Sequence, residues 1–210
     1  MARNCDLALV GGDTTRGPLS MTVTVFGRVP TGQALTRAGA QPGDLLCVGG
    51  AVGEAGGALE LVLGRQQAAP DIAEPLLARY WSPQPQLAFG QALRGKATAA
   101  LDVSDGLLAD CGHISRASGV ALLIEAERLP VSAALETLLG AERALQQKLG
   151  AGDDYVLAFT LPPHHLPELQ AQWPQMAVIG RVEAGEGVRV LDKLGQDITP
   201  RQGGYLHFME

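Results

Sequence analysis

The chain has 210 residues and a formal net charge of −6 at neutral pH. This length is enough to bury a hydrophobic core without disulfides or metals. The negative charge argues against general binding to nucleic acid, whose phosphate backbone it would repel. An acidic protein still binds phosphorylated small molecules when divalent cations bridge the negative charges, so we expect carboxylates near any phosphate site to come with Mg²⁺.

The three cysteines are widely spaced and form no CxxC pair. This pattern favours a reduced, cytoplasmic chain with inert thiols over a disulfide framework or a zinc site. The first apolar run, residues 7–10, is too short for a signal peptide or a membrane span, and it predicts a buried strand.

The first elements along the chain are this strand, a glycine-rich loop at 11–17 and a second strand at 21–27. Two strands alone are not independently stable. We therefore expect partners from upstream sequence and interpret residues 1–30 as the remnant of a further domain. Residues 31–44 are rich in glycine and proline and predict a linker into a main domain at 45–210.

Apolar patterning in the main domain predicts strands at 45–48, 97–103, 120–124, 155–161, 177–182 and 188–192. Between them it predicts helices opening at 49–53 and running through 61–63, and at 70–81, 84–93, 107–118, 131–139, 141–149 and 163–172. Strands and helices alternate at irregular spacing. This order is typical of an α+β fold, a mixed β-sheet with helices packed on it.

Several catalytic motifs are missing from the sequence: the P-loop, a GxGxxG that opens a helix, HExxH and GxSxG. The adjacent His164 and His165 lie among prolines at a predicted helix start. A solvated helix end explains this pair better than a metal site.

The first candidate site follows the strand at 7–10, where Gly11 and Gly12 precede Asp13. Glycines let backbone N–H groups approach a phosphate, and an adjacent carboxylate suits Mg²⁺. A tight turn capped by Asp13 is the alternative.

The second candidate site is the stretch Leu-Asp-Val-Ser-Asp-Gly-Leu at 101–107. Strand alternation places Asp102 and Ser104 on one face, and Asp105 stands where a helix begins. Two carboxylates and a hydroxyl at a strand's carboxyl end predict a metal and phosphate site. The alternative, a helix cap by Ser104 or Asp105, leaves unexplained a carboxylate at Asp102 in an apolar strand.

Two further stretches carry polar or aromatic groups next to glycines. Asp153 and Asp154 follow a glycine loop and precede a strand; either a ligand site or a polar loop with a strand cap fits them. The aromatic tail at 203–208 either folds over a ligand or docks on the surface.

Together, the Gly-Gly-Asp-Thr-Thr-Arg-Gly at 11–17, the Asp-Val-Ser-Asp-Gly-Leu at 102–107, the Gly-Asp-Asp-Tyr at 152–155 and the Gly-Gly-Tyr-Leu-His-Phe at 203–208 resemble thiamine-monophosphate kinases in order and spacing. These enzymes belong to the aminoimidazole-ribotide-synthetase-like (AIR-synthetase-like) superfamily. The resemblance covers essentially the whole chain and implies that residues 45–210 are an AIR-synthetase-like carboxy-terminal domain. It also implies that the family's amino-terminal third, with an Asp-Asp metal motif and a β-barrel shared between two subunits, is absent.

The resemblance assigns site residues by position. It implies Mg²⁺ ligands at Asp13, Asp102 and Asp105; ATP contacts at Gly12, Asp13, Arg37 and Ser104; and substrate contacts at Asp153 and Tyr205. Asp153 stands where the family usually has the longer Glu.

The implied activity is in-line transfer of the γ-phosphoryl group of MgATP to thiamine monophosphate, giving thiamine diphosphate without a covalent nucleophile. The full-length protein would be a homodimer that binds neither nucleic acid nor membrane. Two alternatives stay open. One is another enzyme of the superfamily, such as an aminoimidazole ribotide synthetase, a selenophosphate synthetase or a hydrogenase maturation protein. The other is a weakly active or non-catalytic fragment, since catalysis depends on a complete, positioned site.

Overall fold

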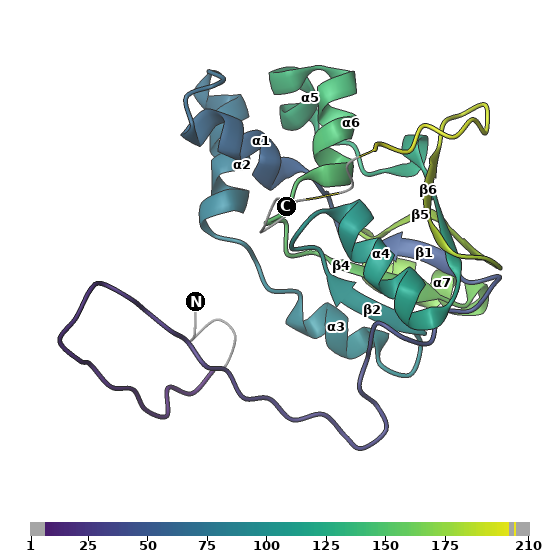
Figure 1. Ribbon diagram of the computed structural model, residues 1–210, viewed down its shortest axis with the longest axis horizontal. Coiled ribbons are helices and arrows are strands. Elements are labelled where there is room, and N and C mark those ends of the chain that lie inside the picture. The colour runs from purple at the N-terminus through teal and green to yellow at the C-terminus, as the bar shows by residue number, and fades with distance from the viewer. Residues whose placement is uncertain (1–6, 202–203, 205–210) are drawn as a thin grey trace. The chain divides into compact units, whose positions relative to one another are not determined.

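The computed structural model describes residues 7–201 and 204 (Figure 1). The chain divides into two units, Met1–Ala34 and Leu35–Glu210. Within the described residues, no helix is both long and apolar enough to cross a membrane.

The larger unit is built on a six-stranded mixed sheet with the strand order β2-β4-β1-β5-β3-β6. Its strands are β1 (Leu45–Val48), β2 (Ala99–Asp102), β3 (Ala121–Glu125), β4 (Leu157–Leu161), β5 (Ala177–Glu183) and β6 (Gly187–Leu191). Neighbouring strands pair antiparallel except β3 and β6, which are parallel. The expected α+β fold with a mixed sheet is confirmed.

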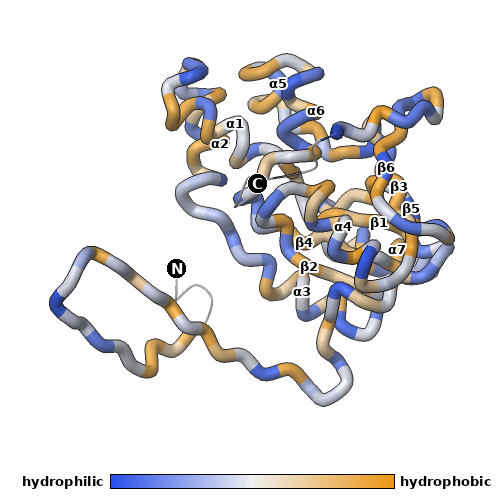
Figure 2. The backbone as a smooth tube through the Cα atoms, viewed as in Figure 1, coloured by the Kyte–Doolittle hydropathy of each residue, from blue (hydrophilic) through white to orange (hydrophobic). Residues whose placement is uncertain are grey.

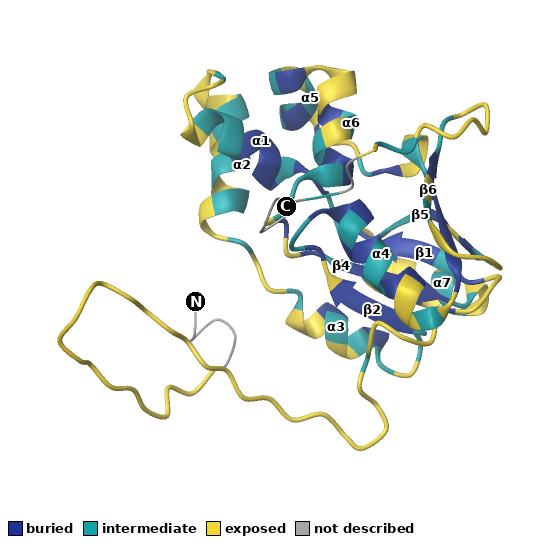
Figure 3. Ribbon diagram, viewed as in Figure 1, coloured by how far each residue is buried: buried dark blue, intermediate teal, exposed yellow. Residues whose placement is uncertain are grey.

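Helices cover both faces of this sheet. Side chains alternate along a strand, so in β1 the side chains of Leu46 and Val48 join the core beneath α4 (Leu107–Ser118), whereas Cys47 joins the opposite core. That second core is completed by α3 (Leu87–Leu93) and α7 (Leu166–Gln172). Figure 3 shows β1, β2 and β4 as largely buried strands between these helices.

Four more helices pack together beside the sheet around a small core of their own. They are α1 (Glu54–Val62), α2 (Pro70–Trp81), α5 (Ala133–Leu139) and α6 (Ala141–Gly150). The first leaves the end of β1, and the last leads through a loop into β4, so this helical group is tied to the sheet at the ends of two neighbouring strands (Figure 1). Two short 3-10 helices, η2 (Ala126–Arg128) and η3 (Pro163–His165), complete the fold.

Local chemistry explains where several helices begin and end. Gly119 adopts the left-handed conformation (φ 65°) that ends α4, as its sequence predicts. Ser132 starts α5 by accepting a hydrogen bond from the backbone N–H of Leu135, so this helix begins later than the predicted 131. The predicted helix at 84–93 begins only at Leu87, since prolines in the preceding segment disfavour helix in the residues before them.

The strands predicted at 7–10 and 21–27 are wrong, because the structure has no strand or helix in the described part of the first unit. The apolar side chains of both segments are exposed, with Leu9 at 92% and Val10 at 88% (Figures 2 and 3). A strand is stable only when its backbone groups pair, and no described residue pairs with these segments. The interpretation of residues 1–30 as a domain remnant and of 31–44 as a linker remains a prediction.

Phe159 provides a test of this core, because its fully buried ring lies on β4 in edge-to-face contact with Phe89. We expect Phe159→Ala to lower the free energy of unfolding by about 3–5 kcal/mol, the usual effect of removing a buried aromatic ring. Chemical denaturation measures this change. The control Leu194→Ala removes a 72% exposed side chain, and we expect a change within about 0.5 kcal/mol. Equal effects of the two variants would contradict the assigned core.

Candidate active site

The acidic motif at 102–105 lies where β2 ends and the chain turns into α4. Asp102 is the last residue of the strand and is exposed, whereas the three residues before it are buried. Asp102 thus belongs to an apolar strand as expected, but the expectation that its carboxylate is buried there at a cost is wrong, because the side chain is exposed. Because water solvates the exposed carboxylate of Asp102, it pays no desolvation cost that a partner group would have to offset.

A buried carboxylate on α4 holds this loop in shape. Asp110 accepts hydrogen bonds from the backbone N–H groups of Ser104 (2.9 Å) and Asp105 (3.0 Å). Burial raises the pKa of Asp110, and the two hydrogen bonds oppose this shift. The residue at the N-cap position is Gly106, so Ser104 and Asp105 do not fill the N-cap position considered for them.

The loop before β4 runs directly alongside the acidic motif. The N–H of Asp153 donates to the carbonyl of Ser104 (3.0 Å), and the N–H of Tyr155 donates to the carbonyl of Val103 (2.9 Å). Gly152 makes this approach possible, because a Cβ atom there would lie 2.1 Å from the Ser104 carbonyl oxygen. The structure thus brings together the second and third candidate sites.

Two residues of this loop have unusual backbone conformations. Asp153 has φ 65° and Tyr155 has φ 51°, a region that non-glycine residues seldom adopt and that costs about 1–3 kcal/mol each. The Tyr155 hydroxyl donates a hydrogen bond to Asp153 Oδ1 (2.9 Å). This bond is the main reason that the pKa of Tyr155 is raised, followed by burial and by the charges of Asp153, Asp102 and Asp105. Acidic side chains from both the 102–105 motif and the 152–155 motif therefore raise the pKa of the same phenol.

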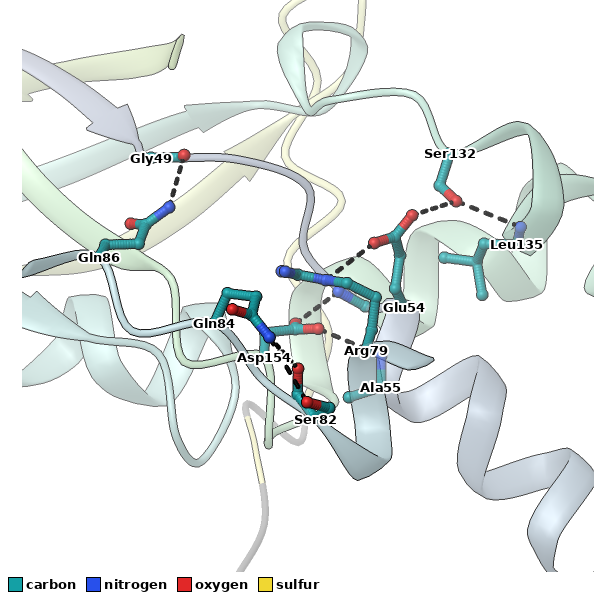
Figure 4. Close-up of polar contacts among 11 residues, drawn as sticks. Gly49, Glu54, Ala55, Arg79, Ser82, Gln84, Gln86, Ser132, Leu135 and Asp154 are labelled. Carbon is teal, nitrogen blue, oxygen red and sulfur yellow. Dashed lines mark hydrogen bonds and ion pairs between the residues drawn. The ribbon is translucent and has the colours of Figure 1, made fainter. Parts of the chain in front are cut away.

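Between these two unusual residues, Asp154 is 4% exposed and is directed to the start of α1 (Figure 4). Its Oδ2 accepts from the N–H of Gly53 (2.5 Å) and its Oδ1 from the N–H of Ala55 (3.2 Å). Burial raises the pKa of Asp154 to about 6, although these bonds and the charge of Arg79 lower it.

Further polar contacts surround this carboxylate (Figure 4). Arg79 pairs with Glu54 on α1 (3.2 Å), and Glu54 accepts a hydrogen bond from the Ser132 hydroxyl (2.8 Å). Gln86 donates to the carbonyl of Gly49 and accepts from a backbone N–H at the start of β4. The neighbourhood of Asp154 thus links α1, α2, α5 and the ends of two strands.

The C-terminal segment also reaches the acidic motif. A Cβ atom at Gly204 would lie 2.6 Å from Cβ of Ala109 and 2.7 Å from the carbonyl oxygen of Asp105. Tyr205, the predicted substrate contact, lies outside the described residues. Gly204, the residue before it, nevertheless lies next to Asp105, a predicted metal ligand.

A pocket opens between α6 and the segment that precedes Gly204. It is lined by Glu142, Leu145, Gln146, Leu149, Gly150, Ile198, Pro200 and Arg201. Gly150 also lies against the acidic loop, because a Cβ atom at Gly106 would be 2.7 Å from the Gly150 carbonyl oxygen. The pocket is therefore adjacent to the candidate site.

Arg37, a predicted ATP contact, is not brought to this cluster. The Arg37 carbonyl accepts a hydrogen bond from Ser118 at the far end of α4 (3.2 Å), and this 12-residue helix is about 18 Å long. Gly12 and Asp13 belong to the first unit, where the N–H of Thr14 donates to Asp13 Oδ1 (2.8 Å).

The residue types at the site fit Mg²⁺ better than a softer metal. Among the described residues, no three His, Cys, Asp or Glu side chains already converge as a metal site. Mg²⁺, however, commonly takes only one or two protein carboxylates and completes its shell with water and phosphate oxygens. Exposed Asp102 and half-buried Asp105 offer such a pair. The buried thiols of Cys47 and Cys111, with pKa values raised to about 12, are unsuited to metal binding or nucleophilic attack.

Among protein families, the chain matches the model described as "AIR synthase related protein, C-terminal domain" over residues 41–193. The chain is 42% identical over 209 residues to the thiamine-monophosphate kinase of Escherichia coli strain K12 and 40% identical to that of Salmonella typhimurium. Each alignment covers 97% of this chain but only 64% of the relative.

Among solved structures, the chain is also similar to thiamine-monophosphate kinases. The thiamine-monophosphate kinase of Stenotrophomonas maltophilia is 42% identical with a TM-score of 0.73, over 77% of this chain and 54% of that one. AaThiL complexed with AMPPCP and TMP is 34% identical with a TM-score of 0.68, over 83% and 54%. The hydrogenase maturation protein HypE of E. coli is 21% identical with a TM-score of 0.65, over 87% and 56%, which shows a shared fold alone.

Gly152 offers a test of the contact between the two loops. We expect Gly152→Ala to lower the free energy of unfolding by about 1–3 kcal/mol, because the added methyl group meets backbone that cannot easily move aside. The matched control is Gly150→Ala in the same region, where no atom lies within 4 Å of the added Cβ; we expect no loss beyond about 0.5 kcal/mol. Chemical denaturation of both variants measures these changes, and equal losses would contradict the described contact.

Asp154 provides a pH-dependent test. Its pKa rises from 3.8 to about 6 on folding, so the folded state binds the proton more tightly, and stability from this group falls as pH rises between these values. We expect the free energy of unfolding to fall by roughly 2–3 kcal/mol relative to Asp154→Asn between pH 4 and pH 7, and then to level off. Urea denaturation across this range measures the difference. A difference that stays flat or rises with pH would show that the carboxyl is not buried as described.

Proposed function

Because the chain belongs to the family of AIR synthase related proteins, we propose that it is the C-terminal part of a cytoplasmic kinase that phosphorylates thiamine monophosphate with ATP. The observation that carries this proposal is the pairing of the loops at 102–106 and 150–155. This pairing brings the carboxylates of the first loop, Asp102 and Asp105, next to the loop that carries Asp153. Carboxylate oxygens are the hard ligands that Mg²⁺ prefers. The likeness to curated thiamine-monophosphate kinases, and to AaThiL complexed with AMPPCP and TMP, supports the choice of substrates.

The chain spans 64% of the length of these relatives. The activity of a whole enzyme is therefore proposed for the protein of which these residues form a part, and so is its homodimeric state. We propose that residues 1–210 alone turn over weakly or not at all, since the family resemblance assigns further metal ligands outside them.

Each described site residue has a proposed role. Asp102 and Asp105 would hold Mg²⁺, which when bound neutralises the charge of phosphate groups that would otherwise repel each other. Ser104 lies between them, where its hydroxyl would contact ATP, while Asp110 keeps the loop in shape. Asp153 would bind the acceptor on the neighbouring loop. No residue serves as a covalent nucleophile, because the acceptor phosphate attacks the γ-phosphoryl group directly.

The remaining contacts are proposed from the resemblance alone. Gly12 and Asp13 would approach the nucleotide phosphates, and Tyr205 would pack on the thiamine ring. Arg37 would contact ATP from the far end of α4. That role requires the bound nucleotide to extend away from the acidic loop, because the Arg37 backbone is separated from Ser104 by about the length of this helix.

Calorimetric titration of MgATP into the chain and its Asp102→Asn variant tests the nucleotide site. We expect the variant to bind at least about tenfold more weakly, equivalent to about 1.4 kcal/mol, because it loses a charged metal ligand. The control Asp71→Asn removes the same charge from an exposed position on the outer helix α2, and we expect unchanged affinity.

Two results would contradict the proposal. Equal affinity of wild type and Asp102→Asn would exclude the acidic loop as the metal site. Binding of a different acceptor but not of thiamine monophosphate, in a side-by-side titration, would assign the chain to another reaction of the superfamily.

A further inference from the structure

Asp154 is a buried anion that the proposed reaction does not use directly. It satisfies two backbone N–H groups at the start of α1, where the N-cap residue Gly53 has no side chain to do so. A helix start favours a negative charge, and the nine-residue α1 receives one from a loop distant in sequence. The glycine-rich turn at 49–53 is thus closed by the protein's own carboxylate.

The residues on either side of Asp154 face the opposite environment. Asp153 is exposed and Tyr155 is 41% exposed, whereas Asp154 is buried. Both neighbours have positive φ angles, and such conformations persist only where the surroundings enforce them. The two N–H groups of α1 hold the central side chain, and the backbone of Val103 and Ser104 holds its neighbours.

The exposed pair is itself ordered by a hydrogen bond. The Tyr155 hydroxyl donates to Oδ1 of Asp153, and Oδ2 of Asp153 has no hydrogen bond among the described residues. That oxygen can accept a bond from an amino group, and its charge favours a cation. The exposed phenol beside it offers an aromatic surface to a cationic ring. The pair therefore suits a positively charged heteroaromatic compound that carries an amino group.

We propose that Asp154 is a positioning residue that fixes the Asp153–Tyr155 pair as the recognition surface for such an acceptor. The inference rests on the proposed function, because it concerns the acceptor side of the same site. MgATP binding depends on the neighbouring loop at 102–106, so the two ligands respond differently to the loss of Asp154. A residue with a purely structural role would weaken both equally.

The test is calorimetric titration of thiamine monophosphate and, separately, MgATP into the 210-residue chain and its variants. For Asp154→Ala, folded at the assay temperature as checked by circular dichroism, we expect acceptor affinity to fall by about tenfold or more and MgATP affinity by less than about threefold. Asp154→Asn keeps one side-chain oxygen that can accept a hydrogen bond, so its affinity for thiamine monophosphate should lie between those of Asp154→Ala and wild type. Tyr155→Phe, which loses only the hydroxyl, should weaken the binding of thiamine monophosphate and leave the binding of MgATP unchanged.

Glu54→Gln is the matched control. It alters the neighbouring acid of the same polar cluster, which binds Arg79 and Ser132 but not the loop. We expect it to lower stability without changing acceptor affinity. Unchanged acceptor affinity in Asp154→Ala, or equal losses for both ligands, overturns the proposal.

Hydrogen exchange separates this inference from the proposed function. If the wild-type chain binds neither ligand, the proposed function fails for this chain, and amide exchange then decides the role of Asp154. Asp154→Ala should raise the exchange rates of the Asp153 and Tyr155 amides by about tenfold or more, while Glu54→Gln leaves them unchanged. If the rates in Asp154→Ala match those of wild type, Asp154 does not hold the loop.

Discussion

The site depends on the backbone contact between the loop that follows β2 and the loop that precedes β4. A hydrogen bond joins Ser104 and Asp153, and Gly152 lets the backbones of the two loops approach more closely than any side chain would allow. Because β2 and β4 are neighbours in the sheet, this contact extends their pairing beyond the last strand residues. Acids from two sequence motifs consequently stand on a rigid edge instead of on independent loops.

Two buried carboxylates support the exposed ones. Asp110 holds the first loop and Asp154 holds the second, each through two backbone N–H groups. The roles are divided, since Asp102 and Asp153 are exposed while the two buried carboxylates fix the backbone of the loops that carry them. The accumulated negative charge would repel a phosphate, so divalent cations are an expected component of any phosphate complex here.

Much of this arrangement follows from the sequence, and the exceptions have identifiable causes. The end of α4 was predictable because Gly119 ends it, and the motif at 102–105 was recognisable because two acids and a serine fall within four residues at the end of an apolar strand. Asp110 and Asp154 were missed as supports, since their role depends on partners that only the folded chain brings near. The strands predicted at 7–10 and 21–27 failed for the same reason, because an apolar run or an alternating pattern specifies a strand only when a neighbouring ladder exists.

The two thiols described above lie in different layers of the molecule. Cys47 is packed in the core beneath α3 and α7, and Cys111 lies in the core beneath α4. A maleimide or disulfide reagent reaches either sulfur only when the layer over it opens. Time-resolved labelling followed by peptide mass spectrometry would therefore report the opening of each face of the sheet separately, and would show whether the two layers unfold together or in sequence.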